Sequence, residues 1–336
     1  MNELRPQPAI AAAMRHRPLE RAMLHRRWVR SLVRGAGAVG LTALVWPRFM
    51  APYRCQIKRY AMPLRGIGEA FRGYRILHLT DLHTGRTRQK YLKRVIKQCM
   101  ALEPNLIVIT GDLIHYHPDS PGLLAELLPL LKAPDGVLAT LGNHDYNEYS
   151  SRYTGARSAR RTIHRRLRAL LAQSQVRMML NQASCIKRGD DELWLVGIDD
   201  FWSPGFNPAA AFAQAPANAV GICLEHNPDA LTQVRDFQWQ WMLCGHSHGG
   251  QVHVPLLGPM YVPMQHRNWL RGMFKLDSTA GEVSELGSDR DEQRSASSRA
   301  IGRGDRIMYV SCGLGYTAPF RMFAPPEAAL FELLPL

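Results

Sequence analysis

The sequence lacks the cysteine spacing that a disulfide scaffold or a zinc ribbon needs. It has six cysteines in 336 residues, with no Cys-x-x-C pair and no dense short-range spacing. Both protein classes depend on closely spaced cysteines, so the sequence argues against cysteine-based chemistry. No internal repeat is apparent. The hydrophobic content of 46% is enough for one sizeable α/β domain with appendages.

Acidic residues are scarce near the N-terminus, and this decides how the net charge is interpreted. The formal net charge is +14, and half of it lies in residues 1–53, which contain nine arginines and two acidic residues. The rest is spread over a far longer stretch. No motif combines aromatic with basic residues in the way that nucleic-acid-binding modules do. We therefore predict no specific nucleic-acid partner.

An apolar run long enough to span a bilayer comfortably is also missing. Residues 35–46 are apolar and uncharged, but they fall short of the roughly 20 residues that cross a membrane. The preceding Arg26-Arg27-Trp-Val-Arg30 is similar to a degenerate twin-arginine export signal, and no clean cleavage site follows. We predict a basic leader at 1–34, an uncleaved apolar anchor or signal segment at 35–53, and a folded domain at 54–336. An amphipathic or buried N-terminal helix is the alternative.

From residue 74 onward, short apolar runs alternate with longer amphipathic segments, which is typical of a layered α/β domain. The predicted strands are 75–80, 105–110, 136–141, 192–198, 219–224, 239–244, 307–311 and 328–333. The predicted helices are 88–102, 121–131, 158–171 and 208–215. Residues 278–305 contain few large apolar side chains, so we predict a flexible loop inserted into the domain there.

Polar clusters follow five of the predicted strands at their C-terminal ends, which is the edge where open α/β sheets bind ligands. These clusters are Asp81-Leu-His83, Gly111-Asp112, Gly142-Asn-His-Asp145, Glu225-His226-Asn227 and Gly245-His-Ser-His-Gly249. Carboxylate, imidazole and amide oxygen together suit Mn, Fe or Zn rather than a metal that prefers thiols. We predict two divalent metal ions, with Mn favoured and Fe or Zn as alternatives.

In this order, the five clusters resemble the full motif set of the calcineurin-like metallophosphoesterases. The resemblance covers roughly residues 75–336, and five ordered motifs are far more specific than any one of them. Glu225-His-Asn-Pro-Asp229 and Gly313-Leu-Gly315 are similar to the bacterial YaeI/YkuE-type branch. The resemblance implies an α/β layered fold, with a β-sandwich flanked by helices and an N-terminal membrane anchor.

The resemblance also implies a role for each site residue. The seven implied ligands are Asp81, His83 and His248 for one metal, Asn143, His226 and His246 for the other, and Asp112 as the bridge between them. His144 would protonate the leaving-group oxygen or stabilise its developing charge, and Asp145 would orient the His144 imidazole. His115 and His117 lie outside the motif set, and we predict solvated loop positions for both. Arg321 could contact a phosphate or be an ordinary surface residue, and we leave it out of the predicted site.

The activity implied by the resemblance is metal-dependent hydrolysis of a phosphodiester or pyrophosphate bond. One member of the broader branch acts on UDP-diacylglucosamine, so a lipid-linked or nucleotide-sugar-lipid substrate is a candidate. The implied partners are a membrane lipid surface and the phosphoester substrate. The basic leader and the apolar segment predict a location at the bacterial inner membrane, and the twin-arginine-like pattern favours the exported side for the folded domain. The alternative is a membrane-tethered binding or scaffold protein with a catalytically silent metal site. The sequence leaves the oligomeric state open.

Overall fold

The computed structural model describes residues 45–146, 157–254, 256–260, 262–286 and 290–336. The chain forms two compact units, Met1–Met50 and Ala51–Leu336. In the first unit the description begins at residue 45 and includes the short π-helix η1 (Trp46–Met50). The predicted leader at 1–34 and residues 35–44 of the predicted apolar segment lie outside the described residues. None of the helices that the structure describes is long and apolar enough to cross a membrane.

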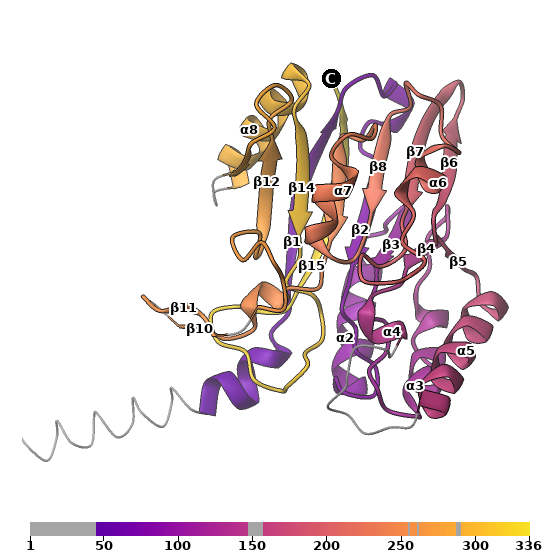
Figure 1. The fold of residues 1–336 in the computed structure, drawn as a ribbon, viewed down its shortest axis with the longest axis vertical. Coiled ribbons are helices and arrows are strands. Elements are labelled where there is room, and N and C mark those ends of the chain that lie inside the picture. Colours follow the sequence, from indigo (N-terminus) through magenta and orange to yellow (C-terminus); the bar gives the residue numbers. More distant parts are fainter. Residues whose placement is uncertain (1–44, 147–156, 255, 261, 287–289) are drawn as a thin grey trace, which may run out of the picture. The chain divides into compact units, whose positions relative to one another are not determined.

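Two β-sheets form the centre of the second unit (Figure 1). The first sheet has the strand order β1-β15-β2-β3-β4-β5, in which β2 to β5 run parallel. Its strands are β1 (Gln56–Leu64), β15 (Glu327–Pro335), β2 (Arg75–Leu79), β3 (Leu106–Thr110), β4 (Val137–Thr140) and β5 (Val176–Met178). Parallel strands leave their C-terminal ends at one edge, so the loops that follow them lie close together.

The second sheet has the order β13-β12-β14-β9-β8-β7-β6, with β7, β8, β9 and β14 parallel. Its strands are β13 (Val283–Glu285), β12 (Gly272–Leu276), β14 (Arg306–Val310), β9 (Trp241–Cys244), β8 (Gly221–Leu224), β7 (Asp191–Gly197) and β6 (Gln182–Arg188). A separate short hairpin joins β10 (His253–Val254) to β11 (Gly258–Pro259).

Strand β3 shows why its sequence is an unbroken apolar run. Val108 packs between the two sheets, in one cluster with Leu195 of β7 and Leu243 of β9. Ile107 and Ile109 point to the opposite face, where they pack with apolar side chains of the helices. Because side chains alternate between the faces of a strand, a strand that is covered on both faces is apolar throughout.

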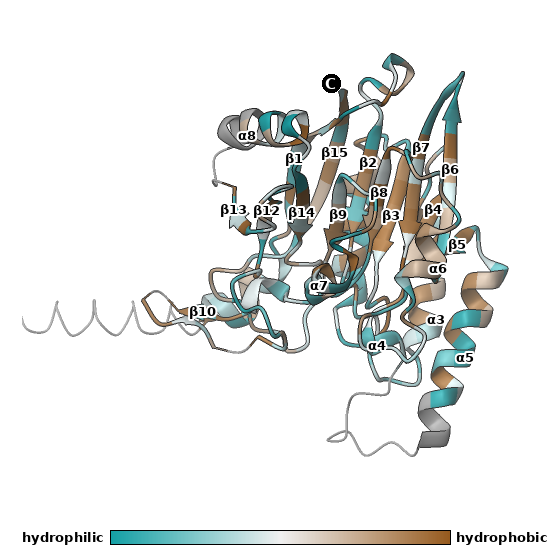
Figure 2. Ribbon diagram, turned by 45° about the horizontal axis from the view of Figure 1, so that its top comes forward, coloured by the Kyte–Doolittle hydropathy of each residue, from teal (hydrophilic) through white to brown (hydrophobic). Residues whose placement is uncertain are grey.

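Helices cover the outer faces of both sheets (Figures 1 and 2). The first sheet is covered by α2 (Gln89–Met100), α3 (Ser120–Ala125) and α5 (Arg157–Gln173), and the second by α6 (Pro208–Phe212) and α7 (Leu231–Val234). The remaining helices are α4 (Asn143–Tyr146) and α8 (Arg290–Arg303), with 3-10 turns at η2 (Ala51–Tyr53), η3 (Glu69–Phe71), η4 (Leu128–Leu130), η5 (Pro228–Ala230) and η6 (His248–Gly250). The fold is therefore mixed α/β, as predicted.

The secondary structure differs from the sequence-based prediction in its unpredicted strands and in residues 278–305. Strands β1, β5, β6, β10, β11 and β12 were not predicted, and β1 illustrates why: it lies at a sheet edge and mixes Lys58 and Arg59 with apolar residues. Residues 278–305, predicted as a loop, contain strand β13 and helix α8. Ala300 and Ile301 of α8 are buried in the cluster between the sheets. These two apolar residues near the C-terminal end of α8 pack against the core. The largely polar composition of residues 278–305 did not predict this packing.

Candidate metal centre

The predicted ligands come from loops that leave both sheets at the C-terminal ends of their strands. In the first sheet, Asp81 and His83 follow β2, Asp112 follows β3, and Asn143 begins α4 after β4. In the second sheet, His226 follows β8, and His246 and His248 follow β9. All seven side chains are buried. The centre is thus built where the edges of two packed sheets meet.

The backbone is strained at these positions. Five of the predicted ligands have positive φ angles, which non-glycine residues rarely adopt: Asp81 (54°), His83 (46°), Asp112 (52°), His246 (68°) and His248 (51°). Such conformations cost free energy and cluster at functional sites. Gly142 is required for another reason, since a Cβ on it would lie 2.5 Å from Asp112 Oδ1. The convergence of these loops therefore has a local cost in backbone conformational energy.

One half of the centre contains Asp81, His83 and His248, which we call the His83 half. His83 Nε2 lies 3.1 Å from His248 Nε2 and 3.8 Å from Asp81 Oδ1, and His248 Nε2 lies 3.5 Å from that same oxygen. Burial raises the pKa of Asp81 to about 7 and lowers the pKa of His83 well below its usual range. The three groups can bind a metal ion together.

The other half contains Asn143, His226 and His246, which we call the His226 half. His226 Nε2 lies 3.2 Å from His246 Nδ1. The second nitrogens of both rings face backbone carbonyls: His226 Nδ1 lies 2.8 Å from the Thr110 oxygen, and His246 Nε2 lies 3.1 Å from the Pro263 oxygen. A carbonyl only accepts hydrogen bonds, so these nitrogens carry the hydrogens and leave His226 Nε2 and His246 Nδ1 to coordinate a metal.

Asp112 lies between the halves. Its Oδ2 is 3.5 Å from His83 Nε2 and 3.3 Å from His226 Nε2, while its Oδ1 accepts a hydrogen bond from the His144 backbone N–H at 2.9 Å. Burial acts to raise the pKa of Asp112, but the nearby histidines, His226 first, outweigh it and hold the pKa well below the usual range. The Asp112 carboxylate in turn raises the pKa of His226 well above its usual value, against the effect of burial. Without metal, a protonated His226 provides the positive charge that this carboxylate needs.

The donor atoms fit metal ions. Donors bound at about 2.0–2.2 Å to one ion lie roughly 3–3.5 Å apart, which matches the nitrogen–nitrogen distances of 3.1 and 3.2 Å in the two halves. Two buried oxygens, Asp81 Oδ1 and Asn143 Oδ1, have no hydrogen-bond partner among the described residues. Buried polar atoms are normally satisfied. Metal coordination would satisfy both.

His144 and Asp145 occupy the site but do not form the expected pair. The Asp145 carboxylate accepts hydrogen bonds from the backbone N–H groups of Gly142 (3.0 Å), Leu113 (3.3 Å) and Ile114 (3.0 Å). His144 Nδ1 is buried and finds no hydrogen-bond partner within the described part of the chain. Asp145 therefore ties the loop after β3 to the loop before α4, and the expectation that it orients the His144 imidazole is wrong for this structure.

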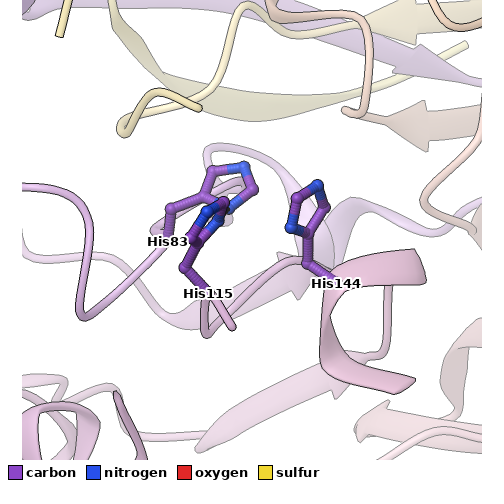
Figure 3. A group of neighbouring side chains, drawn as sticks. All are labelled: His83, His115 and His144. Atoms are coloured by element: carbon purple, nitrogen blue, oxygen red, sulfur yellow. Dashed lines mark hydrogen bonds between the residues drawn. The ribbon is translucent and has the colours of Figure 1, made fainter. Parts of the chain in front are cut away.

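His115 was predicted to be solvated, yet it is buried beside the metal centre. Its Nδ1 lies 3.3 Å from His83 Nδ1, and its ring stacks on that of His144 with centroids 4.9 Å apart. Figure 3 shows His83, His115 and His144 grouped together, although they come from separate loops. Ligation through His83 Nε2 places the hydrogen on His83 Nδ1, and His115 Nδ1 would accept it. His117 is exposed, as predicted.

Arg321 is neither a surface residue nor free to bind phosphate. It is fully buried and donates hydrogen bonds to the carbonyls of Cys312 (2.8 Å) and Ala324 (2.9 Å), and also to the Gly315 carbonyl. Its Nη2 lies 3.3 Å from His248 Nδ1. Burial, and then the charge of Arg321, lower the pKa of His248 well below its usual range. No local sequence signal near Arg321 indicates this contact.

Comparisons with known proteins give one family match and several relatives. Residues 74–250 match the family described as calcineurin-like phosphoesterase. The chain is 27% identical over 340 residues to the UDP-2,3-diacylglucosamine pyrophosphatase LpxG of Chlamydia muridarum, which covers 88% of this chain and 97% of that protein. It is 26% identical over 263 residues to the phosphodiesterase YaeI of Escherichia coli (78% and 82% covered). It is 25% identical over 320 residues to the uncharacterized metallophosphoesterase YkuE of Bacillus subtilis (93% and 98% covered).

Proposed function

The chain belongs to the calcineurin-like phosphoesterase family, and from this premise we propose that it is a two-metal hydrolase of phosphodiester or pyrophosphate bonds. The observation that carries the proposal is the convergence of four imidazoles on Asp81 and Asp112, at the spacing of metal ligands. The alternative of a silent scaffold protein has no support from the site, because every predicted ligand is present and buried.

We assign the seven predicted ligands to two metal ions. Asp81, His83 and His248 would hold one divalent ion, Asn143, His226 and His246 the other, and Asp112 would bridge them. When bound, such a pair supplies an activated water and neutralises charge on a transferring phosphoryl group. The manganese assignment stays a proposal, since imidazole and carboxylate donors also accept iron and zinc.

His144 would act on the leaving group. Burial lowers the pKa of His144 in the free protein, so its imidazole is neutral at neutral pH. A bound phosphoester adds negative charge beside the ring, and an adjacent negative charge favours the protonated imidazole. His144 would then donate a proton to the departing oxygen. Its backbone N–H, bonded to Asp112, fixes its place relative to the bridge.

We also propose a lipid-linked pyrophosphate as the substrate class and a membrane surface as its location. The name of the Chlamydia relative, a UDP-2,3-diacylglucosamine pyrophosphatase, supports this class. The nine arginines of residues 1–53 support the location, because each basic residue near an anionic leaflet contributes about 1 kcal/mol to binding. The bacterial inner membrane, with the domain on the exported side, remains the proposed site of action.

The first experiment tests hydrolysis itself. Purified full-length protein, stripped of metal and then supplied with Mn²⁺, should hydrolyse bis(p-nitrophenyl) phosphate, and the metal-stripped protein should not. His117→Ala, which alters an exposed histidine two residues from His115, should behave like the wild-type protein in both states. A folded, metal-loaded protein that cleaves neither this diester nor UDP-2,3-diacylglucosamine would contradict the proposal.

A second experiment tests the role of residues 1–53. A chain beginning at Arg54 should cleave the soluble diester with nearly unchanged turnover and lose activity on a vesicle-borne substrate, because tethering raises the local substrate concentration without new contacts. Loss of both activities in a folded, metal-loaded protein would place the leader within the active domain. If neither activity changes, a soluble phosphoester becomes the better substrate class.

A further inference from the structure

The hairpin β10–β11 exposes apolar side chains that the fold leaves uncovered. Leu256 is 106% exposed, Leu257 80% and Met260 67%. Phe323, in the loop before β15, is 60% exposed. Isolated apolar residues on a surface are normal, but several large ones gathered on neighbouring segments mark an interaction site. In Figure 2 the tip of this hairpin is brown and projects away from the sheets.

The hairpin is fixed to the metal centre rather than hanging free. It follows η6, which begins with the predicted ligand His248. Its first strand is hydrogen bonded to the loop that carries Phe323: the His253 N–H donates to the Met322 carbonyl, and the Met322 N–H donates to the Gln251 carbonyl, both at 2.9 Å. The turn and the hairpin also touch, since a Cβ on Gly250 would lie 2.7 Å from the Pro259 Cβ.

Two arginines accompany the hairpin, Arg267 and Arg271, both in the segment that follows it. Residues 245–276 contain no aspartate or glutamate, and Lys275 at the end of this segment is paired with Asp277 and Asp305, so only the two arginines of the segment provide free positive charge. Arg267 is exposed, and Arg271 donates a hydrogen bond to the Phe323 carbonyl. Apolar side chains beside basic ones are the composition that binds the interface of an anionic bilayer.

We propose that the β10–β11 hairpin inserts Leu256, Leu257 and Met260 into an anionic lipid surface, with Phe323 beside them, and so places the metal centre at the headgroup level. The proposal rests on the proposed function only for its consequence, which is access to a lipid-linked substrate. It assigns the membrane contact to the folded domain as well as to the leader. The partner is a lipid surface, not a second copy of the chain.

The test uses the full chain and needs no knowledge of the substrate. Hydrogen–deuterium exchange would be measured with and without vesicles of phosphatidylethanolamine and phosphatidylglycerol. Peptides covering residues 252–262 should exchange more slowly with vesicles, by about tenfold if the hairpin spends most of its time in the interface. The triple variant Leu256→Ser, Leu257→Ser, Met260→Ser should lose this protection. Leu336→Ser, which alters an exposed leucine beyond β15, should keep it.

Each other outcome overturns the proposal. Unprotected hairpin peptides in vesicle-bound wild-type protein would do so, as would protection that survives in the triple variant. Protection that appears without vesicles and rises with protein concentration would show that a second copy covers the hairpin. Activity separates this proposal from the hydrolase assignment. The triple variant should keep wild-type turnover of bis(p-nitrophenyl) phosphate, whereas a wild-type protein that is inactive on this diester refutes the hydrolase without affecting the exchange result.

Discussion

The two halves of the metal centre have the same kinds of ligand but different surroundings. In the His226 half, both imidazoles donate their outer N–H to backbone carbonyls, those of Thr110 and Pro263. In the His83 half, the outer nitrogens face side chains instead: His83 faces His115, and His248 faces the guanidinium of Arg321. A carbonyl partner fixes the tautomer that leaves the inner nitrogen free and makes the imidazole a better donor. In the His226 half, backbone carbonyls therefore set the imidazole tautomers that metal binding needs. In the His83 half, the tautomers depend on the side chains of His115 and Arg321.

The contact between Arg321 and His248 works against metal binding. A guanidinium has only donors, so His248 Nδ1 acts as the acceptor and the hydrogen of the neutral ring sits on Nε2, the nitrogen that faces Asp81. Ligation through Nε2 must move that hydrogen to Nδ1, where it would face the guanidinium, whereas an ion at His226 displaces only the extra proton and leaves the carbonyl-bonded Nδ1–H in place. We therefore expect the His83 half to bind its ion more weakly than the His226 half.

Asp112 belongs to both halves, so its removal should have the largest effect. Asp112→Ala should lose most bound metal and lower turnover by about 10⁴-fold or more, since two ions together supply several kcal/mol of charge stabilisation. Metal content by elemental analysis and turnover of bis(p-nitrophenyl) phosphate measure the two effects. A variant that keeps one full equivalent of metal would show that the halves do not depend on a shared carboxylate.

His144 belongs to neither half, so its removal should affect turnover without affecting metal. His144→Ala should lower turnover by roughly 10²–10⁴-fold, the usual contribution of a positioned general acid. Metal content should stay near normal. The effect should shrink for a diester with a more acidic leaving alcohol, because such a group departs without a proton. Loss of metal in this variant would mean that the ring supports His83, with which it is in edge contact at 4.6 Å.

His115 supports only the His83 half, which allows that half to be weakened alone. His115→Leu should reduce the affinity of one metal by about 10–100-fold, as is typical for loss of a hydrogen-bond partner behind a ligand, and leave the other unchanged. His115→Asn should restore most of the affinity, because its Oδ1 can accept from His83 Nδ1. Titration with Mn²⁺ followed by electron paramagnetic resonance resolves the two sites. Equal losses in both variants would reduce His115 to a packing role.

The smallest expected effect is the difference in metal affinity between the two halves of the wild-type protein. Titration of the metal-loaded wild-type protein with a chelator should release the two ions in separate steps, about tenfold or more apart in affinity. In His115→Leu the weaker step should shift and the tighter one should not. If the tighter step shifts instead, the halves are ranked in the wrong order. A single step for both ions would mean that the Arg321 contact carries no penalty.

The sequence by itself determined the kind of site and the chain segments that build it. The residue types in Asp81-Leu-His83, Gly142-Asn-His-Asp145 and Gly245-His-Ser-His-Gly249 are chemical facts, and the apolar runs before them predict strands that end at one edge. All eight strands predicted from apolar runs are strands of the structure: β2, β3, β4, β7, β8, β9, β14 and β15. Local composition is sufficient for these features, because a strand covered on both faces must be apolar wherever it lies.

Only the tertiary structure decided which group forms a hydrogen bond with the outer nitrogen of each histidine ligand. His115 and Arg321 reach their histidines across 32 and 73 residues of sequence, and Thr110 reaches His226 across 116. Neither the burial of His115 nor the attachment of Asp145 to backbone amides leaves a mark in the local sequence. The same holds for Leu256 and Leu257, which are apolar residues typical of a core but lie exposed on the surface. Hydrogen-bond partners and solvent exposure depend on which distant segments meet, and a linear pattern of residue types does not contain that information.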